Sequence, residues 1–441
     1  MFILVIFLWF PRPHGACGAA TIRISNLSTN TSLRYPVALL KGQVDLADGS
    51  PLVVMNESSA RPSRLFRTRV LRGRFKALAE LVPGNNQLKV QCAGGEMQLT
   101  LRYEPMTTPQ VVRVIFVTDP GGRTEYITQK ENDPQDFRAK ISTAVKLLQT
   151  ATAESLHDLG LGRKTFRLEL DQDGEVIVHI FKTPNPASYY QAMSDDQIPY
   201  EMRRLVEPHF PTDRARNLVI MGVTGYDPVA KRALGHTAFA TGNAAVFSAL
   251  GMFSWPSSLQ EVQDAFSDTT RVDPSRVAND SAGRSTFWGL AATTIGVMLH
   301  ELAHTFAGLP HSPDGYSIMS RGFDHFNRVF TVVEPPSAQN SQPVSFRDDE
   351  VARFDRTSAG RLAYCRLFEM DARTYTNHPP PVAVVDPATA NIIVSAPAGL
   401  RTAGLDRDDL SRDTAIYPEV PPQRVEYSFP QLSRLAGGDN F

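Results

Sequence analysis

The sequence has 441 residues, of which 42% are hydrophobic and 21% are charged, and its formal net charge at pH 7 is -1. This length favours two domains over one, and the composition is that of a soluble globular protein. The balanced charge and the lack of a basic run with interleaved aromatic residues give no indication of nucleic-acid binding. The three cysteines, Cys17, Cys92 and Cys365, are too few and too scattered for a disulfide framework or a cysteine-based metal site. We expect Cys92 and Cys365 to be free or buried thiols.

The first 20 residues have the order of a secretory signal peptide. An apolar run over 2–10 is too short to span a bilayer as a helix, and small residues follow it from Gly15 to Ala20. We therefore predict a signal peptide over 1–20 and a protein that is secreted or held in the cell envelope. A buried first strand is the alternative, and the protein would then be cytoplasmic. No other stretch is long and apolar enough to be transmembrane, so we predict no integral membrane segment.

Residues 21–106 are predicted to form a small immunoglobulin-like β-sandwich. The expected strands are short and either alternate or run apolar, at 21–25, 37–46, 75–81, 87–92 and 97–103. Turn signals such as Asp48-Gly49 and Gly94-Gly95 separate them, and no stretch of helical period intervenes. The piece from 80 to 103 resembles the end of many immunoglobulin-like modules. Such a module is either a spacer or a binding domain.

Residues 107–375 change to alternating strands and helices, which predicts an α/β domain. The expected strands are at 111–117, 165–170, 176–181 and 217–222, with an extended edge strand at 235–247. The expected helices are at 137–159, 194–206, 287–306 and 351–367, and a polar loop lies at 335–346. Apolar residues recur at helical spacing in 137–159, so we expect that helix to be amphipathic. The Pro-rich segment 376–441, with a strand-like stretch at 391–395, is predicted to hold a small appended β element.

The helix predicted at 287–306 is apolar nearly throughout, which indicates that it is buried. Ser285 or Thr286 can cap its start, and Gly308 followed by Pro310 ends it, because a left-handed residue and then a proline cannot continue a helix. Its last turns nevertheless carry ionisable side chains. Such groups cost free energy to bury unless they are paired or bound to a metal.

Those side chains form an HExxH string, His300, Glu301 and His304. Residues four apart share a face of a helix, so the two imidazoles can bind one tetrahedral zinc ion. Glu301 can then act as a general base toward a water at the open side of the metal. Catalytic zinc sites usually have three protein ligands; His311 is the obvious third, and Asp314 is the alternative. The competing interpretation, two core histidines and a paired carboxylate, is disfavoured by the residues that follow.

The segment HELAHTFAGLPH, followed by SIMSRG at 317–322, resembles a metzincin: an extended zinc helix, a glycine turn, a third histidine and a Met-turn. More narrowly, the chain resembles a putative zinc metallopeptidase family, also through 235–268 and 321–330. This resemblance covers roughly 111–368.

The resemblance implies zinc ligands at His300, His304 and His311, a general base at Glu301, and Met319 as a hydrophobic floor under the metal. It also implies that the edge strand within 235–247 can pair with an extended peptide substrate. The usual spacing is HExxHxxGxxH, and Ala307 adds one residue here, so that His311 falls one place late. A longer last helical turn could absorb the shift, or the shift could move His311 off the metal.

We therefore predict an immunoglobulin-like β-sandwich and a metzincin-like α/β zinc peptidase domain with one Zn²⁺ per chain. The predicted partner is a protein or peptide substrate. A zinc-stabilised pseudoenzyme that binds a ligand through the sandwich is the alternative, and a zinc hydrolase of non-peptide amides is a third reading. We interpret the nearby Tyr316 and His325 as surface or supporting residues. The sequence does not indicate the cleavage specificity or the oligomeric state.

Overall fold

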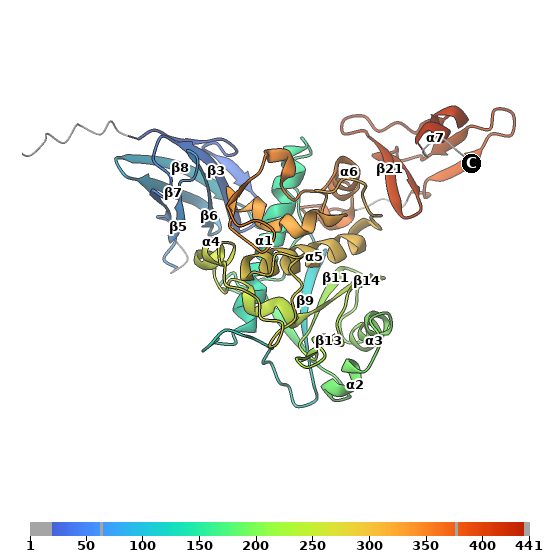
Figure 1. Ribbon diagram of the computed structural model, residues 1–441. Helices are drawn as coiled ribbons and strands as arrows, with labels where there is room; N and C mark the ends of the chain where they lie inside the picture. Colours follow the sequence, from blue (N-terminus) through green and yellow to red (C-terminus); the bar gives the residue numbers. More distant parts are fainter. Residues whose placement is uncertain (1–19, 62–64, 375–377, 436–441) are drawn as a thin grey trace, which may run out of the picture.

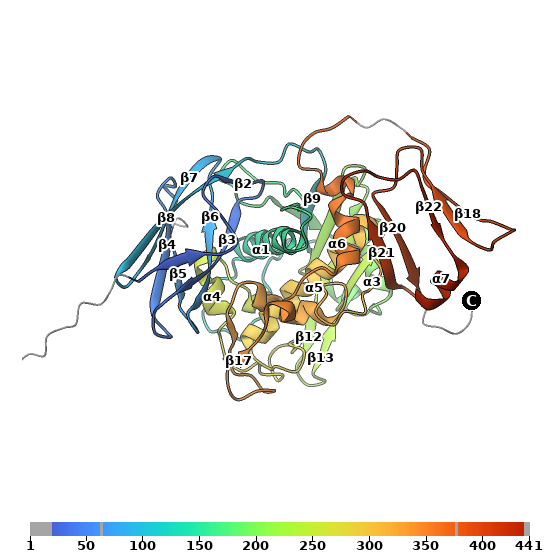
Figure 2. The same cartoon turned by 90° about the horizontal axis from the view of Figure 1, so that it is seen from above.

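The computed structural model describes residues 20–61, 65–374 and 378–435. The predicted signal peptide, except Ala20, and Cys17 lie outside the described residues. Figures 1 and 2 show an N-terminal group of strands and a C-terminal group of strands on either side of a central part built of helices and strands. Among the helices of the described residues, none combines the length and the apolar composition that a membrane span requires.

The N-terminal group consists of two sheets that share one core. Its strands are β1 (Ile22–Ile24), β2 (Thr31–Leu33), β3 (Val37–Val44), β4 (Pro51–Asn56), β5 (Leu65–Arg69), β6 (Arg74–Glu80), β7 (Gly84–Cys92) and β8 (Gly95–Tyr103). The strand orders are β1-β3-β6 and β2-β8-β7-β4-β5, and neighbours are antiparallel except β2 and β8. We did not predict β2, β4 and β5. In β4 the buried positions alternate regularly, but its apolar pattern lies close to turn residues and begins on a proline.

The central sheet has the order β10-β9-β11-β15-β14. Its strands are β9 (Val111–Thr118), β10 (Val178–Lys182), β11 (Ala215–Met221), β14 (Ala238–Thr241) and β15 (Ala244–Ser248). All neighbours are parallel except β14 and β15. The prediction of a single edge strand at 235–247 is wrong, because this segment forms the β14–β15 hairpin. Gly242, at a φ of 59°, allows the tight turn between the two strands. The strand predicted at 176–181 corresponds to β10, with bounds shifted by one or two residues. The strand predicted at 165–170 is replaced by isolated bridges at Leu168 and Leu170.

At β9 both faces of the central sheet are buried, which explains why its residues 111–117 are apolar except for Arg113. Ile115 and Val117 pack in one core with α3 (Gln197–Val206). Val114 and Phe116 pack in the other core, with helices α1 (Phe137–Asp158) and α5 (Phe287–Ala307).

The prediction that the helix at 137–159 is amphipathic is wrong, because α1 is buried on nearly all sides. It lies between the N-terminal sheets and the central part (Figure 2). Its polar side chains are paired instead of solvated: the Thr150 hydroxyl donates to the carbonyl of Val37, Lys146 pairs with Glu80 at 3.1 Å, and Glu154 pairs with Arg163 at 2.7 Å. The helical spacing of apolar residues therefore did not predict that the polar face of α1 is also buried against other parts of the protein.

The helix predicted at 351–367 is shorter than expected. In the structure α6 covers Arg356–Ala363, and a separate 3-10 turn covers Arg366–Phe368. Asp355 caps α6 by accepting the backbone N–H groups of Thr357 and Ser358. The cap fixes the start of α6 at Arg356, five residues after the predicted start at 351. The segment 335–346, predicted as a polar loop, is irregular up to residue 343, but its end contains the short strand β17 (Val344–Ser345), which pairs with β16 (Val333–Glu334).

The remaining short elements connect these parts. They are α2 (Ala187–Gln191), β12 (Gly225–Asp227), β13 (Arg232–Leu234), η2 (Ala249–Ser254), η3 (Leu259–Glu261), α4 (Val262–Ala265), η4 (Arg321–Val329) and η5 (Asp348–Glu350).

The C-terminal group contains a three-stranded sheet, a hairpin and a helix. They are β18 (Val382–Val385), β19 (Ile392–Ser395), β22 (Arg424–Tyr427), the hairpin of β20 (Thr402–Arg407) and β21 (Leu410–Ile416), and α7 (Phe429–Leu435). The hairpin packs on α6, where Arg361 pairs with Asp406 at 2.6 Å. Its tip reaches the chain that follows α5.

Candidate metal centre

Helix α5 forms because its ends are well defined and its sides are apolar. The Thr286 side chain caps the start by accepting the N–H of Gly289, and Gly308 ends the helix at a φ of 58°, in the left-handed region. The backbone of η4 crosses the helix so closely that a Cβ on Gly296 would lie 2.2 Å from the carbonyl oxygen of Phe323. This close packing fixes the helix one turn before His300.

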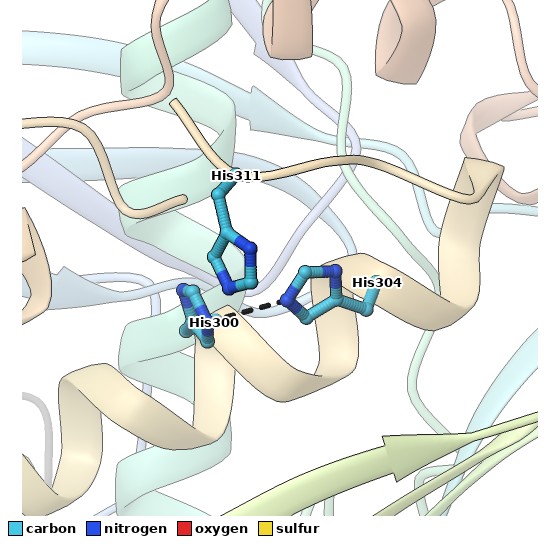
Figure 3. A group of neighbouring side chains, drawn as sticks. All are labelled: His300, His304 and His311. Carbon is cyan, nitrogen blue, oxygen red and sulfur yellow. Dashed lines mark hydrogen bonds between the residues drawn. The ribbon is translucent and has the colours of Figure 1, made fainter. Parts of the chain in front are cut away.

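The structure brings His300, His304 and His311 together (Figure 3). One ligand atom from each lies within 4.8 Å of the others. The Nε2 atoms of His300 and His304 are 3.2 Å apart, and the ring centroid of His311 lies 5.3 Å and 4.9 Å from those of His300 and His304. The first two rings come from one face of α5 and the third from the returning chain.

In each of the three imidazoles the Nδ1 atom already has an oxygen partner. The Nδ1–H of His300 donates to the carbonyl of Ile318 at 2.7 Å, and that of His304 donates to the carbonyl of Leu309 at 2.6 Å. The Nδ1–H of His311 donates to the carboxylate of Asp409 at 2.5 Å. These bonds select the tautomer in which Nε2 carries the lone pair.

The donor set fits a zinc ion. A neutral imidazole has one N–H, and in His300 and His304 it is used at Nδ1, so the two facing Nε2 atoms at 3.2 Å are both acceptors. Two lone pairs facing each other repel unless a cation lies between them. Two nitrogen ligands at about 2.0–2.1 Å from a tetrahedral zinc ion lie roughly 3.3 Å apart, which is close to the observed separation.

Burial keeps the two helix histidines uncharged. Burial, together with the neighbouring His304, lowers the pKa of His300 to about 3. Burial also lowers the pKa of His304. Since a metal ligand must be the neutral imidazole, both side chains are ready to bind at neutral pH without losing a proton first.

Glu301 lies beside this group and beside the edge of the central sheet. Its carboxylate is 4.0 Å from Nε2 of His300. Burial raises the pKa of Glu301 to about 7, although a backbone hydrogen bond from Ala240 in β14 acts in the opposite direction. A carboxylate with such a pKa can both accept and release a proton near neutral pH.

The extra residue Ala307 is accommodated as the last residue of α5. Gly308 then reverses the chain, the carbonyl of Leu309 accepts from His304, and His311 lies against the two helix histidines. The alternative ligand Asp314 is elsewhere, since its carboxylate pairs with Arg353 at 2.8 Å.

Met319 is completely buried, and its carbonyl accepts the N–H of Ser312, which links the SIMSRG turn to the segment that carries His311. Tyr316 and His325 are not part of the histidine group. The Tyr316 hydroxyl donates to Glu350 at 3.3 Å, and His325 contacts Glu334 at 3.3 Å.

Asp409 is the residue of the site that the sequence analysis missed. It is separated from His311 by 98 positions and lies in the turn of the β20–β21 hairpin. The one signal in the sequence is the pair Asp408-Asp409 between two strand-like stretches, which indicates a turn but no contact partner.

Known proteins resemble this chain over much of its length. A putative zinc metalloproteinase of Schizosaccharomyces pombe is 30% identical over 281 residues, which cover 59% of this chain and 45% of that protein. Another, of Saccharomyces cerevisiae, is 22% identical over 402 residues, 81% of this chain and 56% of that protein. The chain thus spans about half the length of the curated relatives it matches.

Among solved structures, wild-type OgpA from Akkermansia muciniphila matches with 17% sequence identity and a TM-score of 0.45, over 76% of this chain and 87% of that chain. The catalytically inactive form of OgpA in complex with an O-glycopeptide substrate gives the same values.

The sequence model of a family described as the putative peptidase family matches residues 21–393. The match includes the two N-terminal sheets, the central sheet and the three histidines, whereas the β20–β21 hairpin lies beyond it. This chain belongs to that peptidase family.

Proposed function

We propose that the protein is a zinc-dependent metallopeptidase that hydrolyses peptide bonds in proteins or peptides. The observation that carries the proposal is the convergence of three imidazoles, each held at Nδ1 by an oxygen, beside a buried carboxylate with a raised pKa. A site built only for structure would not need the carboxylate.

His300, His304 and His311 would hold one zinc ion through Nε2. When bound, such an ion polarises a substrate carbonyl and lowers the pKa of a nearby water. Met319 is proposed to lie beneath the ion as an apolar floor, because it is fully buried in the turn that follows the third histidine.

Glu301 is the proposed general base and acid. Its carboxylate takes a proton from the attacking water as the water oxygen bonds to the scissile carbonyl carbon. It then returns the proton to the amide nitrogen as the carbon–nitrogen bond breaks. A pKa of about 7 suits both transfers, since neither the protonated nor the ionised form is strongly preferred.

The substrate is proposed to bind in extended form along β14. This strand ends the order of the central sheet and pairs with β15, so in the described residues its outer edge has no partner strand. Ala240 of β14 contacts the Glu301 carboxylate. A peptide added to that edge would therefore run past the catalytic carboxylate with its backbone hydrogen-bonded to the sheet.

The wider organisation follows the same proposal. Residues 107–375 would be a metzincin-like catalytic domain, 21–106 an immunoglobulin-like sandwich that acts as a spacer, and 376–441 an appended β segment. We further propose export to the cell envelope or beyond through residues 1–20.

The test is digestion of an unfolded protein such as casein, and of a peptide library, by purified wild type and by Glu301→Gln. We expect cleavage by the wild type that is lost with a chelator and restored by zinc. Glu301→Gln should be about 10²–10⁴-fold slower while holding as much zinc. Full activity of Glu301→Gln would exclude the mechanism, and zinc binding without cleavage would favour the pseudoenzyme. The library also reports the cleavage preference.

A further inference from the structure

The geometry points to Asp409 as a positioning residue of the metal centre, so that the β20–β21 hairpin is a working part of the site and not only an appendage. This inference rests on the proposed zinc site. It goes beyond that site because it assigns a role to a segment outside the residues 21–393 that the family model matches.

The hairpin holds His311 by three hydrogen bonds. The Nδ1–H of His311 donates to the Asp409 carboxylate at 2.5 Å, and the backbone N–H of His311 donates to the Asp409 carbonyl at 2.9 Å. The carbonyl of His311 accepts the N–H of Ser411, also at 2.9 Å. His311 thus pairs with the start of β21 as a short parallel bridge, and both its backbone and its ring are oriented by the hairpin.

The hairpin is itself fixed to the catalytic part of the molecule. Arg361 of α6 forms two bonds with Asp406, at 2.6 Å and 2.8 Å. A Cβ on Gly360 would lie 2.6 Å from the side chain of Ile416, so β21 and α6 are in close contact. Because α6 in turn packs on α1 and α5, the hairpin is held in a fixed position and can hold His311 in place.

The need for such a support differs among the three histidines. His300 and His304 are held by α5 and have backbone carbonyl partners, whereas His311 follows the end of the helix and its side chain is 45% exposed. A carboxylate on Nδ1 fixes the tautomer and the ring orientation and makes Nε2 a stronger donor to a metal. Loss of such a partner typically weakens metal binding by about 10–100-fold.

The turn offers a matched pair of variants. Asp408 and Asp409 are adjacent, and both have a left-handed backbone, with φ of 53° and 58°. Glycine relieves the strain of that conformation at either position, so Asp409→Gly and Asp408→Gly change the turn alike. Only the first removes the carboxylate that contacts His311, since the Asp408 side chain pairs with Arg407.

The experiment measures the zinc dissociation constant of the full chain by competition with a chromophoric chelator. We expect Asp409→Gly to raise it about 10–100-fold, Asp409→Asn to raise it less because the amide oxygen can still accept, and Asp408→Gly to leave it within about twofold. Thermal unfolding of the metal-free proteins should be alike for the two glycine variants. With zinc added, the stabilisation should be smaller for Asp409→Gly.

Equal zinc affinity of wild type and Asp409→Gly would overturn the inference, as would an equal loss in Asp408→Gly. His300→Ala separates this failure from failure of the proposed function. If His300→Ala loses zinc and Asp409→Gly does not, the zinc site stands and the role of the hairpin falls. If the wild type binds no zinc, both fall.

Discussion

The two histidines of α5 and the third histidine reach the same point by different physical means. His300 and His304 are placed by one buried helix, and carbonyl groups of nearby residues orient their rings. His311 lies in the half-buried chain that follows α5 and is oriented by Asp409 from a hairpin distant in sequence. Two ligands are therefore preorganised by local structure, and the third depends on a long-range contact. The following predictions test this difference, beginning with the largest effect.

Removal of a helix ligand should have the largest effect. His304→Ala leaves one zinc-binding imidazole on α5. Loss of a residue that only supports a ligand weakens zinc binding by up to ~100-fold, so loss of the ligand itself should weaken it by well over ~100-fold. Peptidase activity should disappear with it. Metal analysis after dialysis checks the prediction, with His157→Ala, a histidine at the end of α1, as the control. Retention of one tightly bound zinc by His304→Ala would show that α5 does not supply two ligands.

The packing that supports α5 should depend on the buried pair of Arg328 and Glu334. The two side chains form bonds of 2.9 Å and 3.0 Å, at the junction of η4 and β16. Glu334→Gln leaves the Arg328 charge buried without its partner, so we expect the free energy of unfolding to fall by about 3–5 kcal/mol. Urea unfolding measures it. Arg347→Gln, which removes an exposed cation paired with Asp349, is the control and should change stability by less than about 1 kcal/mol.

The same pair gives a pH dependence. Burial by itself would raise the pKa of Glu334, but hydrogen bonds from His325 and Arg328 together with the Arg328 charge lower it from 4.5 to about 2. Because the folded pKa is the lower one, the stabilisation is present above about pH 4.5 and is lost as the pH falls through about 2. The stability difference between wild type and Glu334→Gln should therefore shrink over that range, and an unchanged difference would contradict the assignment.

Deletion of Ala307 tests how the third histidine is placed. One residue turns a helix by about 100°, so the deletion changes the direction in which the chain leaves α5. His311 could then no longer meet both the helix histidines and the hairpin, and we expect zinc affinity to fall about 10–100-fold. Ala307→Ser keeps the helix length and should bind zinc as the wild type does. Tight zinc binding by the deletion variant would mean that the return of His311 is flexible.

The smallest effect is expected at Lys76, where the N-terminal sheets meet the central part. Burial, with smaller contributions from Lys41 and Arg74, lowers the pKa of Lys76 from 10.5 to about 7. The folded state therefore bears the cost of a buried charge below about pH 7, and that cost decreases as the pH rises toward 10.5. Relative to Lys76→Met, wild-type stability should increase by about 2 kcal/mol from pH 7 to 9. A constant difference would contradict the lowered pKa.

The sequence predicted what short-range rules control. The start and end of α5 follow from Thr286 and Gly308, and the grouping of His300 with His304 follows from helical spacing alone. The length of α6 was overestimated because the apolar pattern continues past the cap that Asp355 provides. In α5 and in α6 the residue that fixes the helix boundary lies within a few residues of that boundary. The length of α6 was predicted wrongly because the cap at Asp355, and not the apolar pattern, determines where the helix begins.

What the sequence did not predict depends on tertiary contacts. The coverage of α1 comes from β3 of the N-terminal sheets and from β10, α5 and α6 of the central part. Its polar residues Lys146 and Glu154 are therefore paired inside the protein and do not form a solvent-facing side. The role of Asp409 was likewise hidden, because a turn residue carries no information about a partner 98 positions away.

The most direct test of the account is a crystal structure of the zinc-loaded protein, with anomalous scattering measured at the zinc edge. We predict one ion bound by Nε2 of His300, His304 and His311 at about 2.0–2.1 Å, with a fourth position open beside Glu301. The Asp409 carboxylate should accept from His311 Nδ1 in the same structure. An ion held by the two helix histidines without His311, or by Asp314 in its place, would contradict the account.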